Sequence, residues 1–467
     1  MAGNEVDRAA EGAPGGRDAD AHRPRTGETS AAALNAVEER VVAAVAEGRD
    51  ELVALARELV ALDTTARETG DPPRDEDRLQ RLLEARLRSI GAETDLWEPE
   101  STGTGNRHVP DDLDFAGRPQ LAARLAGRGG GRSLLLNGHI DAVSAEPKEL
   151  WSSDPFSAEV RDGRIYGRGI ADMKGGLAGM LFALETLRRL DMRLAGDVVY
   201  CTVTDEESSG AGGWAAVKRG VKADAGVVAE PTDFDVWVAC RGSLTPTITV
   251  EGRPGHAEMR QPHWRAGGAV NAIEKMKLVL DAIERLREEW RGRPDMQHPH
   301  VSPGDIVPTV IAGGEWEVTY PASCRLVCEV VYPPAQVGED GTARGLEREI
   351  AEAIESAARV DPWLREHPLR WFWDCDVVPA EVDPAHPVVA TALGAGAAVG
   401  RAGRITGFDS WHDGATFTNF GGTPSVCFGP GPADTLHRID EWAGIDDLVD
   451  FAAAAALLTM RWCGVTR

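Results

Sequence analysis

Short apolar runs alternate along this chain with longer segments in which apolar residues recur at helical spacing. Apolar runs of strand length predict β-strands that are buried on both faces. Three such runs lie at residues 133–136, 197–203 and 225–228. Helical spacing predicts helices at residues 32–61 with a break at Gly48, at 75–87 with an end at Gly91, and at 172–190. This half of the chain therefore predicts an α/β fold with a central β-sheet flanked by helices.

The middle of the chain has a different pattern, which predicts a second domain. Its segments follow the order β-α-β-β-α-β, which is the order of a small ferredoxin-like α+β domain. We therefore predict an inserted domain at 235–375, which divides the larger domain into 31–234 and 376–467. Residues 1–30 lack apolar periodicity and are predicted to be a disordered tail. The segments of the inserted domain are 236–250, 266–290, 309–318, 323–332, 346–358 and 369–374.

Composition and charge restrict the possible partners. Hydrophobic residues make up 42% of the chain, which is enough for a sizeable core, and the formal net charge is -25. A surface this acidic repels nucleic acid and anionic membranes, so we expect neither as a partner. No apolar stretch has the length of a signal-peptide core or a membrane span, so we expect a cytoplasmic protein. The 7 cysteines are scattered and are expected to be reduced packing residues.

Side chains that can bind a metal ion follow the predicted strands. In an open α/β sheet the ligand crevice lies beyond the carboxyl ends of the strands, so these side chains are expected to converge. Two histidines together with several carboxylates predict a dinuclear metal site. The candidates are His139 after the first strand, Asp172 at the start of a helix, Glu206 and Glu207 after the second strand, Glu230 after the third, and His437 after a Gly-Pro-rich turn.

These residues match the roles that two metal ions require, namely a bridging anion and ligands for each ion. Asp172 is the natural bridge, and a helix start would favour its negative charge. We expect His139 and Glu207 to bind one ion. Glu230 and His437 would bind the other.

Two carboxylates next to these ligands have predicted supporting roles. Glu206 is adjacent to the ligand Glu207 but points elsewhere if strand side chains alternate, so it is the expected general base. Asp141 lies two residues after His139 on the same strand face and is expected to orient its imidazole. Zn, Co and Mn all accept imidazole and carboxylate ligands, so the ligand types leave the metal open.

In combination, these motifs resemble the M20 metallopeptidase family, which includes acetylornithine deacetylase and succinyl-diaminopimelate desuccinylase. The likeness extends from about residue 51 to the C-terminus, and the segments that carry it are 138–141, 167–176, 205–207 and 230–232. The resemblance implies a zinc-aminopeptidase-like catalytic domain with two zinc ions. It implies His139, Asp172, Glu207, Glu230 and His437 as their ligands, Glu206 as general base and acid, and Asp141 as the orienting carboxylate.

The resemblance also implies an activity and an assembly. The activity is hydrolysis of the amide bond of an N-acylated small-molecule amine by a hydroxide held between the two zinc ions. The inserted domain would be a lid through which two chains form a homodimer. In this dimer His256, within the segment 252–257, would reach across to stabilise the oxyanion of the tetrahedral intermediate.

One stretch departs from the family pattern. Many members bind the α-carboxylate of the substrate through an arginine near the end of a lid strand, but the corresponding residues 328–334 contain none, and an Asn-containing turn is replaced by 318–321. Arginine gives a bidentate recognition of carboxylate that Val or Tyr cannot supply. We therefore hypothesise a substrate whose amine side is neutral, aromatic or bulky. Five tryptophans are either a lining for such a group or packing residues: Trp264, Trp316, Trp371, Trp373 and Trp411.

Several alternatives stay open at this point. The same metals could serve a dipeptidase or carboxypeptidase, the reaction could run toward amide formation, and the fold could persist as a catalytically idle dimeric scaffold. Converging buried carboxylates are costly without a function, which counts against the scaffold. Ser410, His412 and Asp413 include the residue types of a serine-hydrolase triad, but they lie too close together in the chain to form one.

Overall fold

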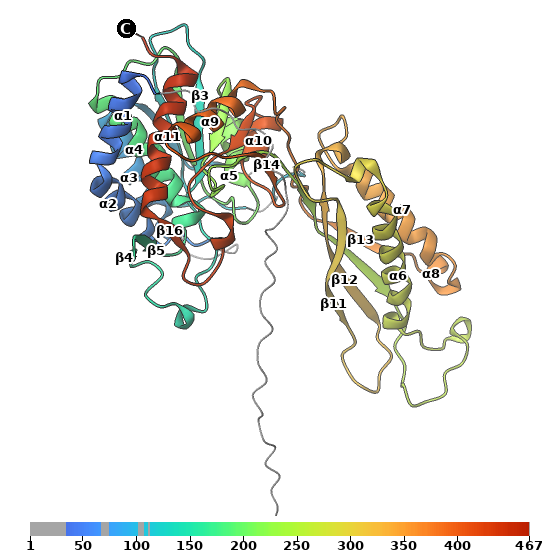
Figure 1. Cartoon of the computed structure of the whole chain (residues 1–467). Helices are drawn as coiled ribbons and strands as arrows, with labels where there is room; N and C mark the ends of the chain where they lie inside the picture. Colours follow the sequence, from blue (N-terminus) through green and yellow to red (C-terminus); the bar gives the residue numbers. More distant parts are fainter. Residues whose placement is uncertain (1–33, 67–73, 101–106, 111–112, 467) are drawn as a thin grey trace, which may run out of the picture.

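The computed structural model describes residues 34–66, 74–100, 107–110 and 113–466, so the predicted tail at 1–30 lies outside the described residues. The described chain forms a larger and a smaller body that lie side by side (Figure 1). An 8-stranded sheet crosses the larger body, and a 5-stranded sheet forms the smaller one. The chain enters the smaller body from the larger one and returns to it, as predicted from the sequence.

The large sheet has the strand order β1-β2-β6-β3-β7-β15-β8-β14. Its central strand β3 is buried along its whole length and runs parallel to both neighbours, β6 and β7. These are the three strands predicted from apolar runs, and the prediction is confirmed. The strands are β1 (Glu93–Trp97), β2 (Gln120–Leu125), β3 (Leu134–His139), β6 (Val198–Val203), β7 (Ala225–Val228), β8 (Val236–Cys240), β14 (Ile405–Phe408) and β15 (Ser425–Cys427).

Helices cover both faces of the large sheet. On one face α4 packs against α11, and α1, α2, α3 and α9 complete the main hydrophobic core. On the other face α5 and α10 pack over β6, β7 and their neighbours. A three-stranded sheet of β4 (Glu159–Arg161), β5 (Arg164–Tyr166) and β16 (Trp442–Gly444) lies beside α11. The helices are α1 (Ala36–Glu47), α2 (Arg49–Val60), α3 (Glu76–Ser89), α4 (Gly175–Arg189), α5 (Ala211–Arg219), α9 (Pro387–Ala398), α10 (Gly414–Asn419) and α11 (Ile445–Cys463).

The smaller body is a ferredoxin-like domain with helices on one face of an antiparallel sheet. Its strand order is β11-β12-β10-β13, with β9 paired to β12. Alternate residues of β12 are buried against α6 and α7, among them Cys324 and Cys328, which are therefore core residues as predicted. The elements are β9 (Gly242–Leu244), β10 (Pro246–Glu251), α6 (Ala272–Arg291), β11 (Asp305–Gly313), β12 (Ser323–Tyr332), α7 (Arg344–Ala358), α8 (Pro362–Glu366) and β13 (Arg370–Trp373).

The prediction of a single strand at 236–250 is wrong. It is divided into β8, β9 and β10, and β8 belongs to the large sheet, where it pairs parallel with β14 and antiparallel with β15. All residues of β8 are buried, because it is covered on both faces. The 5-stranded sheet of the smaller body therefore begins at Gly242 rather than at residue 235. Similarly, the strand predicted at 309–318 ends at Gly313, where Gly314 adopts a φ of 86°.

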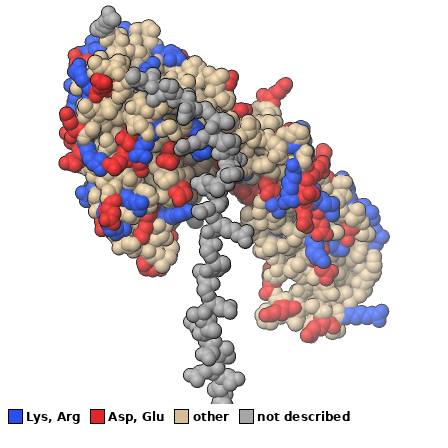
Figure 2. All heavy atoms as spheres, viewed as in Figure 1, with Lys and Arg blue, Asp and Glu red and all other residues tan. Residues whose placement is uncertain are grey.

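The surface of the protein carries both basic and acidic side chains. On the face shown in Figure 2, basic and acidic side chains are interspersed over both bodies. Within the described residues, no helix combines the length and the apolar character needed to cross a membrane.

The approach of α4 to the end of β7 gives a test of the packing. A Cβ added at Gly176 would lie 2.3 Å from the carbonyl oxygen of Ala229, a main-chain atom that cannot move aside. We expect Gly176→Ala to lower the free energy of unfolding by about 1–3 kcal/mol because of this overlap. Gly394→Ala in α9 is the matched control, since its nearest neighbour is an Arg461 guanidinium nitrogen at 3.7 Å. The control should be neutral or stabilising by up to about 1 kcal/mol. Urea unfolding followed by circular dichroism measures both, and equal midpoints would contradict the packing argument.

Candidate active site

The residues at or directly after the ends of three strands lie at one edge of the large sheet. β3 ends at His139 itself, β6 ends at Val203 before the Glu206-Glu207 turn, and β7 ends two residues before Glu230. Since β3 lies between β6 and β7 and all three run parallel, their carboxyl ends meet at the same edge. The predicted convergence of these side chains is present.

The carboxylate of Asp172 lies between the two histidines. Its Oδ1 is 3.0 Å from Nε2 of His139, and its Oδ2 is 3.4 Å from Nε2 of His437. Asp172 does not begin a helix, because its φ of -119° and ψ of 91° are extended and α4 starts only at Gly175. The predicted helix-start position of Asp172 is therefore wrong. An irregular turn presents one carboxylate oxygen to each histidine.

The remaining ligand candidates form two groups around Asp172. Nε2 of His139 lies 3.9 Å from Oε1 of Glu230, and Nε2 of His437 lies 3.2 Å from Oε2 of Glu207. These distances differ from the predicted pairing, which placed His139 with Glu207 and Glu230 with His437. Ligand atoms of His139, Asp172 and Glu207 also lie within 4.8 Å of one another, so the two groups adjoin.

The sequence prediction placed Glu206 and Glu207 on opposite faces of a strand. They lie instead in a turn beyond β6, so strand alternation does not separate their side chains. The carboxylate of Asp141 holds this turn, since it accepts hydrogen bonds from the main-chain N–H groups of Glu206 at 3.3 Å and Glu207 at 3.1 Å. Oε2 of Glu206 lies 3.9 Å from Nε2 of His139. Glu206 therefore faces the His139 side of the site, while Glu207 faces His437.

Asp141 also contacts His139, but through its main chain. Nδ1 of His139 is 2.9 Å from the carbonyl oxygen of Asp141, whereas the nearer carboxylate oxygen is 3.8 Å away. Because a carbonyl oxygen only accepts hydrogen bonds, Nδ1 donates to it, and Nε2 is the ring nitrogen that faces the carboxylate of Asp172. The orienting contact predicted for Asp141 is therefore made by its carbonyl group.

The site concentrates negative charge where water is excluded. Burial is the largest cause that raises the pKa values of Glu206, Glu207 and Glu230 above the ordinary range, and neighbouring carboxylates add to it. Burial acts against a charged His139, but the carboxylates around it prevail and raise its pKa well above normal. Hydrogen bonds to Asp172 and Glu207 raise the pKa of His437 to about 10.

The donor set fits divalent cations. Within the described part of the chain, no lysine or arginine forms an ion pair with the carboxylates of Asp172, Glu206, Glu207 or Glu230. Buried charges need a counter-charge, and cations bound between these oxygens and imidazole nitrogens would supply it. Cation binding would also displace protons from the two imidazoles.

His412 and Asp413 do not form a catalytic dyad. Both ring nitrogens of His412 and both carboxylate oxygens of Asp413 are buried without a hydrogen-bond partner among the described residues. Burial raises the pKa of Asp413 to about 7. The rejection of a serine-hydrolase triad at this position is supported, because the histidine lacks the acid contact that such a triad requires.

The smaller body places His256 far from the metal-ligand candidates of its own chain. His256 pairs with Thr319 in the connection between β11 and β12. This connection lies at one end of β12, and the other end reaches the junction of the two bodies, where the Tyr332 hydroxyl contacts Asp376. A strand of 10 residues spans about 33 Å, so His256 lies at the end of the smaller body that is remote from the larger one.

The sequence matches the model of peptidase family M20/M25/M40 over residues 135–461. The chain belongs to this family. Among curated proteins it is 30% identical over 447 residues to the N-formyl-4-amino-5-aminomethyl-2-methylpyrimidine deformylase of Halalkalibacterium halodurans, covering 92% of this chain and 98% of that protein. The succinyl-diaminopimelate desuccinylase of Methylorubrum extorquens is 34% identical over 241 residues, which cover 49% of this chain and 58% of that enzyme.

The fold is also that of solved M20 structures. A tripeptidase from Staphylococcus aureus superposes with a TM-score of 0.67 at 19% identity, covering 89% of this chain and 98% of that one. Membership of the M20 family makes the protein a metal-dependent hydrolase with a candidate ligand cluster in the expected place.

Two buried ion pairs that support this M20 site were not predicted from the sequence. Arg118 pairs with Asp205 at 2.8 Å directly before the Glu206-Glu207 turn, and Arg168 pairs with Glu441 at 2.6 Å beside the Asp172 turn. Three of the four partners lie close to a motif residue, which was the available signal: Asp205 directly precedes Glu206, Arg168 lies shortly before Asp172, and Glu441 lies shortly after His437. Their pairing partners are distant in sequence, so only the tertiary structure could identify them.

Removal of divalent metal should destabilise this M20 protein. We expect a chelator to lower the free energy of unfolding by about 3 kcal/mol when the metal is present at about one hundred times its dissociation constant. Differential scanning fluorimetry with and without chelator measures the shift in melting temperature, and added zinc should restore it. Asp172→Asn is the control, because loss of the shared carboxylate charge should reduce the response. An unchanged melting temperature of the wild type would contradict a metal-stabilised site.

Proposed function

We propose that this protein is a deacylase that binds two divalent metal ions, preferably zinc, and hydrolyses the amide bond of an N-acylated small molecule. His139 and Glu230 would hold one ion, Glu207 and His437 would hold the other, and Asp172 would contribute to both. The observation that carries this assignment is the position of Asp172, whose two carboxylate oxygens face the two histidines separately. A carboxylate placed in this way is suited to bridge two cations.

When bound, the two ions would polarise the scissile carbonyl and lower the pKa of a water molecule toward neutrality. Glu206 is the group that takes the proton of this water and returns it to the leaving amine. It lies at the edge of the ligand cluster, 3.9 Å from Nε2 of His139, and is therefore available for this transfer. Burial is the largest cause that raises the pKa of Glu206 well above its ordinary range.

The substrate class we propose is a short-chain acyl amide, such as a formamide, of an amine that carries no α-carboxylate. Two observations support it. The deformylase, which by its name acts on an N-formyl aminomethylpyrimidine, matches this chain over 92% of its length, whereas the desuccinylase matches over 49%. The end of β12, at residues 328–334, also lacks an arginine to bind a carboxylate.

A peptidase is the second candidate function, because a tripeptidase shares the fold. The two functions differ in what the enzyme must bind next to the scissile amide, which is an uncharged amine for the deacylase and a peptide carboxylate or ammonium group for the peptidase. An idle scaffold is disfavoured by the retained, electrostatically costly cluster.

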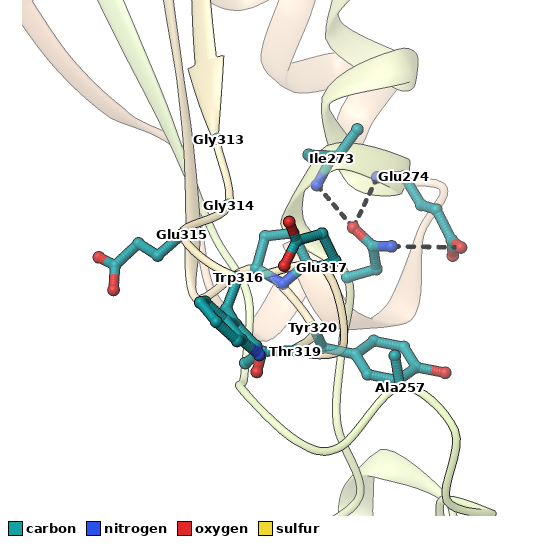
Figure 3. Close-up of a pocket in the computed structure, with 12 residues that line it drawn as sticks. Ala257, Ile273, Glu274, Gly313, Gly314, Glu315, Trp316, Glu317, Thr319 and Tyr320 are labelled. Atoms are coloured by element: carbon teal, nitrogen blue, oxygen red, sulfur yellow. Dashed lines mark hydrogen bonds between the residues drawn. The ribbon is translucent and has the colours of Figure 1, made fainter. Parts of the chain in front are cut away.

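We further propose that the lid forms a homodimer and that His256 acts on the metal site of the second chain. β11 is an edge strand of the 5-stranded sheet, and its residues Val307–Gly313 are exposed. Val310 and Ile311 present apolar side chains there. An exposed, apolar edge strand favours pairing with another strand. Beside it is a pocket of about 560 Å³ lined by Trp316, Thr319 and Tyr320 among others, next to the His256 segment (Figure 3).

Glu206→Gln tests the reaction. We expect kcat to fall by about two to four orders of magnitude on N-formyl and N-acetyl aromatic amines, because the amide cannot accept the proton. Metal content should be unchanged, since Glu206 is not a proposed ligand. A panel of N-formyl, N-acetyl and N-succinyl amines assayed beside dipeptides and tripeptides identifies the substrate class. Hydrolysis of peptides in preference to acyl amines would favour the peptidase function, and full activity of Glu206→Gln would refute its assigned role.

Mixing two inactive variants tests the action of His256 across the dimer. Glu206→Gln retains His256, and His256→Ala retains Glu206. If His256 acts in trans, each mixed dimer has one complete site, and statistical exchange of subunits should restore about a quarter of wild-type activity. If His256 acts within its own chain, or if the protein is a monomer by light scattering, the mixture stays inactive. Mixing Glu206→Gln with Glu207→Ala is the control, because both changes affect residues in the larger body and each variant supplies an intact His256.

A further inference from the structure

Glu441 is a buried carboxylate behind the candidate metal site that has no role in the proposed reaction. It is 1% exposed and lies four residues after His437, directly before β16. The main chain on both sides is fixed, because Gly167 N–H donates to the carbonyl oxygen of Glu441 at 2.9 Å and Trp442 pairs with Tyr166 in the three-stranded sheet. The side chain is thus directed from a rigid position.

Both oxygens of this carboxylate are used to hold the turn that carries Asp172. Oε1 accepts hydrogen bonds from the main-chain N–H of Ala171 at 2.8 Å and from that of Asp172 at 3.2 Å. Oε2 accepts from Nη1 of Arg168 at 2.6 Å and from the main-chain N–H of Gly169 at 3.2 Å. One side chain therefore satisfies three main-chain donors of a single turn, those of Gly169, Ala171 and Asp172.

The turn depends on these bonds because its backbone is irregular. Gly169 has a φ of 84°, and Asp172 and Met173 have non-helical angles, so the N–H groups of this segment are not aligned as in a regular helix. Buried N–H groups without a partner are costly, which gives the turn a reason to keep the geometry that Glu441 accepts. Arg168, itself 2% exposed, supplies the positive charge that compensates the carboxylate and donates through Nε to the carbonyl oxygen of Ser144 at 3.2 Å.

Glu441 also connects two candidate ligands. The segment 437–441 begins with His437, whose imidazole approaches Asp172 from the solvent side, and ends with Glu441, which holds the main chain of Asp172 from behind. A displacement of Glu441 would therefore move the Asp172 carboxylate relative to both histidines. Groups that hold metal ligands in this manner commonly change metal affinity by about 10–100-fold when they are removed.

We propose that Glu441 is a positioning residue, which sets the Asp172 carboxylate between the two ligand groups and thereby controls the retention of both metal ions. This inference rests on the proposed dinuclear function of Asp172. It differs from a general stabilising role, which would affect folding and leave the affinity of the folded protein for metal unchanged.

The test compares Glu441→Gln with a change in a partly buried ion pair that is remote from the site. Glu185 on α4 accepts two hydrogen bonds from Arg86, both at 2.9 Å, so Glu185→Gln removes a similar charge. Metal-free proteins are titrated with zinc by calorimetry and with cobalt by visible absorption, and thermal melting of the metal-free forms reports folding. We expect zinc affinity of Glu441→Gln to fall about 10–100-fold with an altered cobalt spectrum, while Glu185→Gln binds both metals like the wild type.

A second variant keeps the test decisive if Glu441→Gln does not fold. Glu441→Asp preserves the charge but shortens the side chain by one methylene, so it cannot reach both groups of donors. It should fold and bind zinc less tightly than the wild type, and its deacylase activity should rise toward the wild-type value as zinc is increased. Wild-type metal affinity in the folded Glu441 variants would overturn the proposal.

The same titrations separate this inference from the proposed function. Wild-type protein that binds two metal ions but cleaves no acyl amide would overturn the deacylase assignment, while the effect of Glu441 on metal affinity would still be measured. Wild-type protein that binds no divalent ion would overturn both. Two bound ions, acyl-amide turnover and unchanged affinity in Glu441→Gln would overturn only the positioning role.

Discussion

An excess of buried negative charge at one edge of the large sheet is the constraint on which the rest of the structure depends. Asp172, Glu206, Glu207 and Glu230 converge there with two imidazoles and, in the described chain, without a paired lysine or arginine. Charges buried in this way repel one another and hold protons, as the raised pKa values of the glutamates indicate. Divalent cations are the counter-charge that the geometry accommodates.

The fold holds these charges in place mainly through hydrogen bonds to the main chain. Asp141 fixes His139 through its carbonyl group and the Glu206-Glu207 turn through its carboxylate. Glu441 holds the Asp172 turn in a comparable manner from the opposite side. Close packing without intervening side chains, as at Gly176 on α4, brings these turns and the strand ends within reach of each other. The ligands are therefore positioned by rigid backbone rather than by the flexibility of their own side chains.

The lid has its own hydrophobic core and contributes nothing to the ligand cluster of its own chain within the described residues. The Gly313 end of its exposed edge strand β11, the Trp316 pocket and His256 lie together at the end remote from the larger body. This separation explains why the proposed oxyanion role of His256 needs a second chain. It also divides the tasks, since the larger body would supply the metal chemistry and the lid would complete the site and restrict the substrate.

The sequence by itself determined the three central strands, the break at Gly48, the order of elements in the lid and the set of residues at the sheet edge. Apolar periodicity and strand ends are local properties, and parallel strands bring their following residues together whatever the details. The pairing of His139 with Glu230 and of His437 with Glu207 followed only from the tertiary structure, as did the placement of β8 in the large sheet. The same is true of Glu441, whose contacts with residues 168–172 lie about 270 positions away in the chain. Such features depend on irregular turns and long-range hydrogen bonds, for which hydrophobic pattern carries no signal.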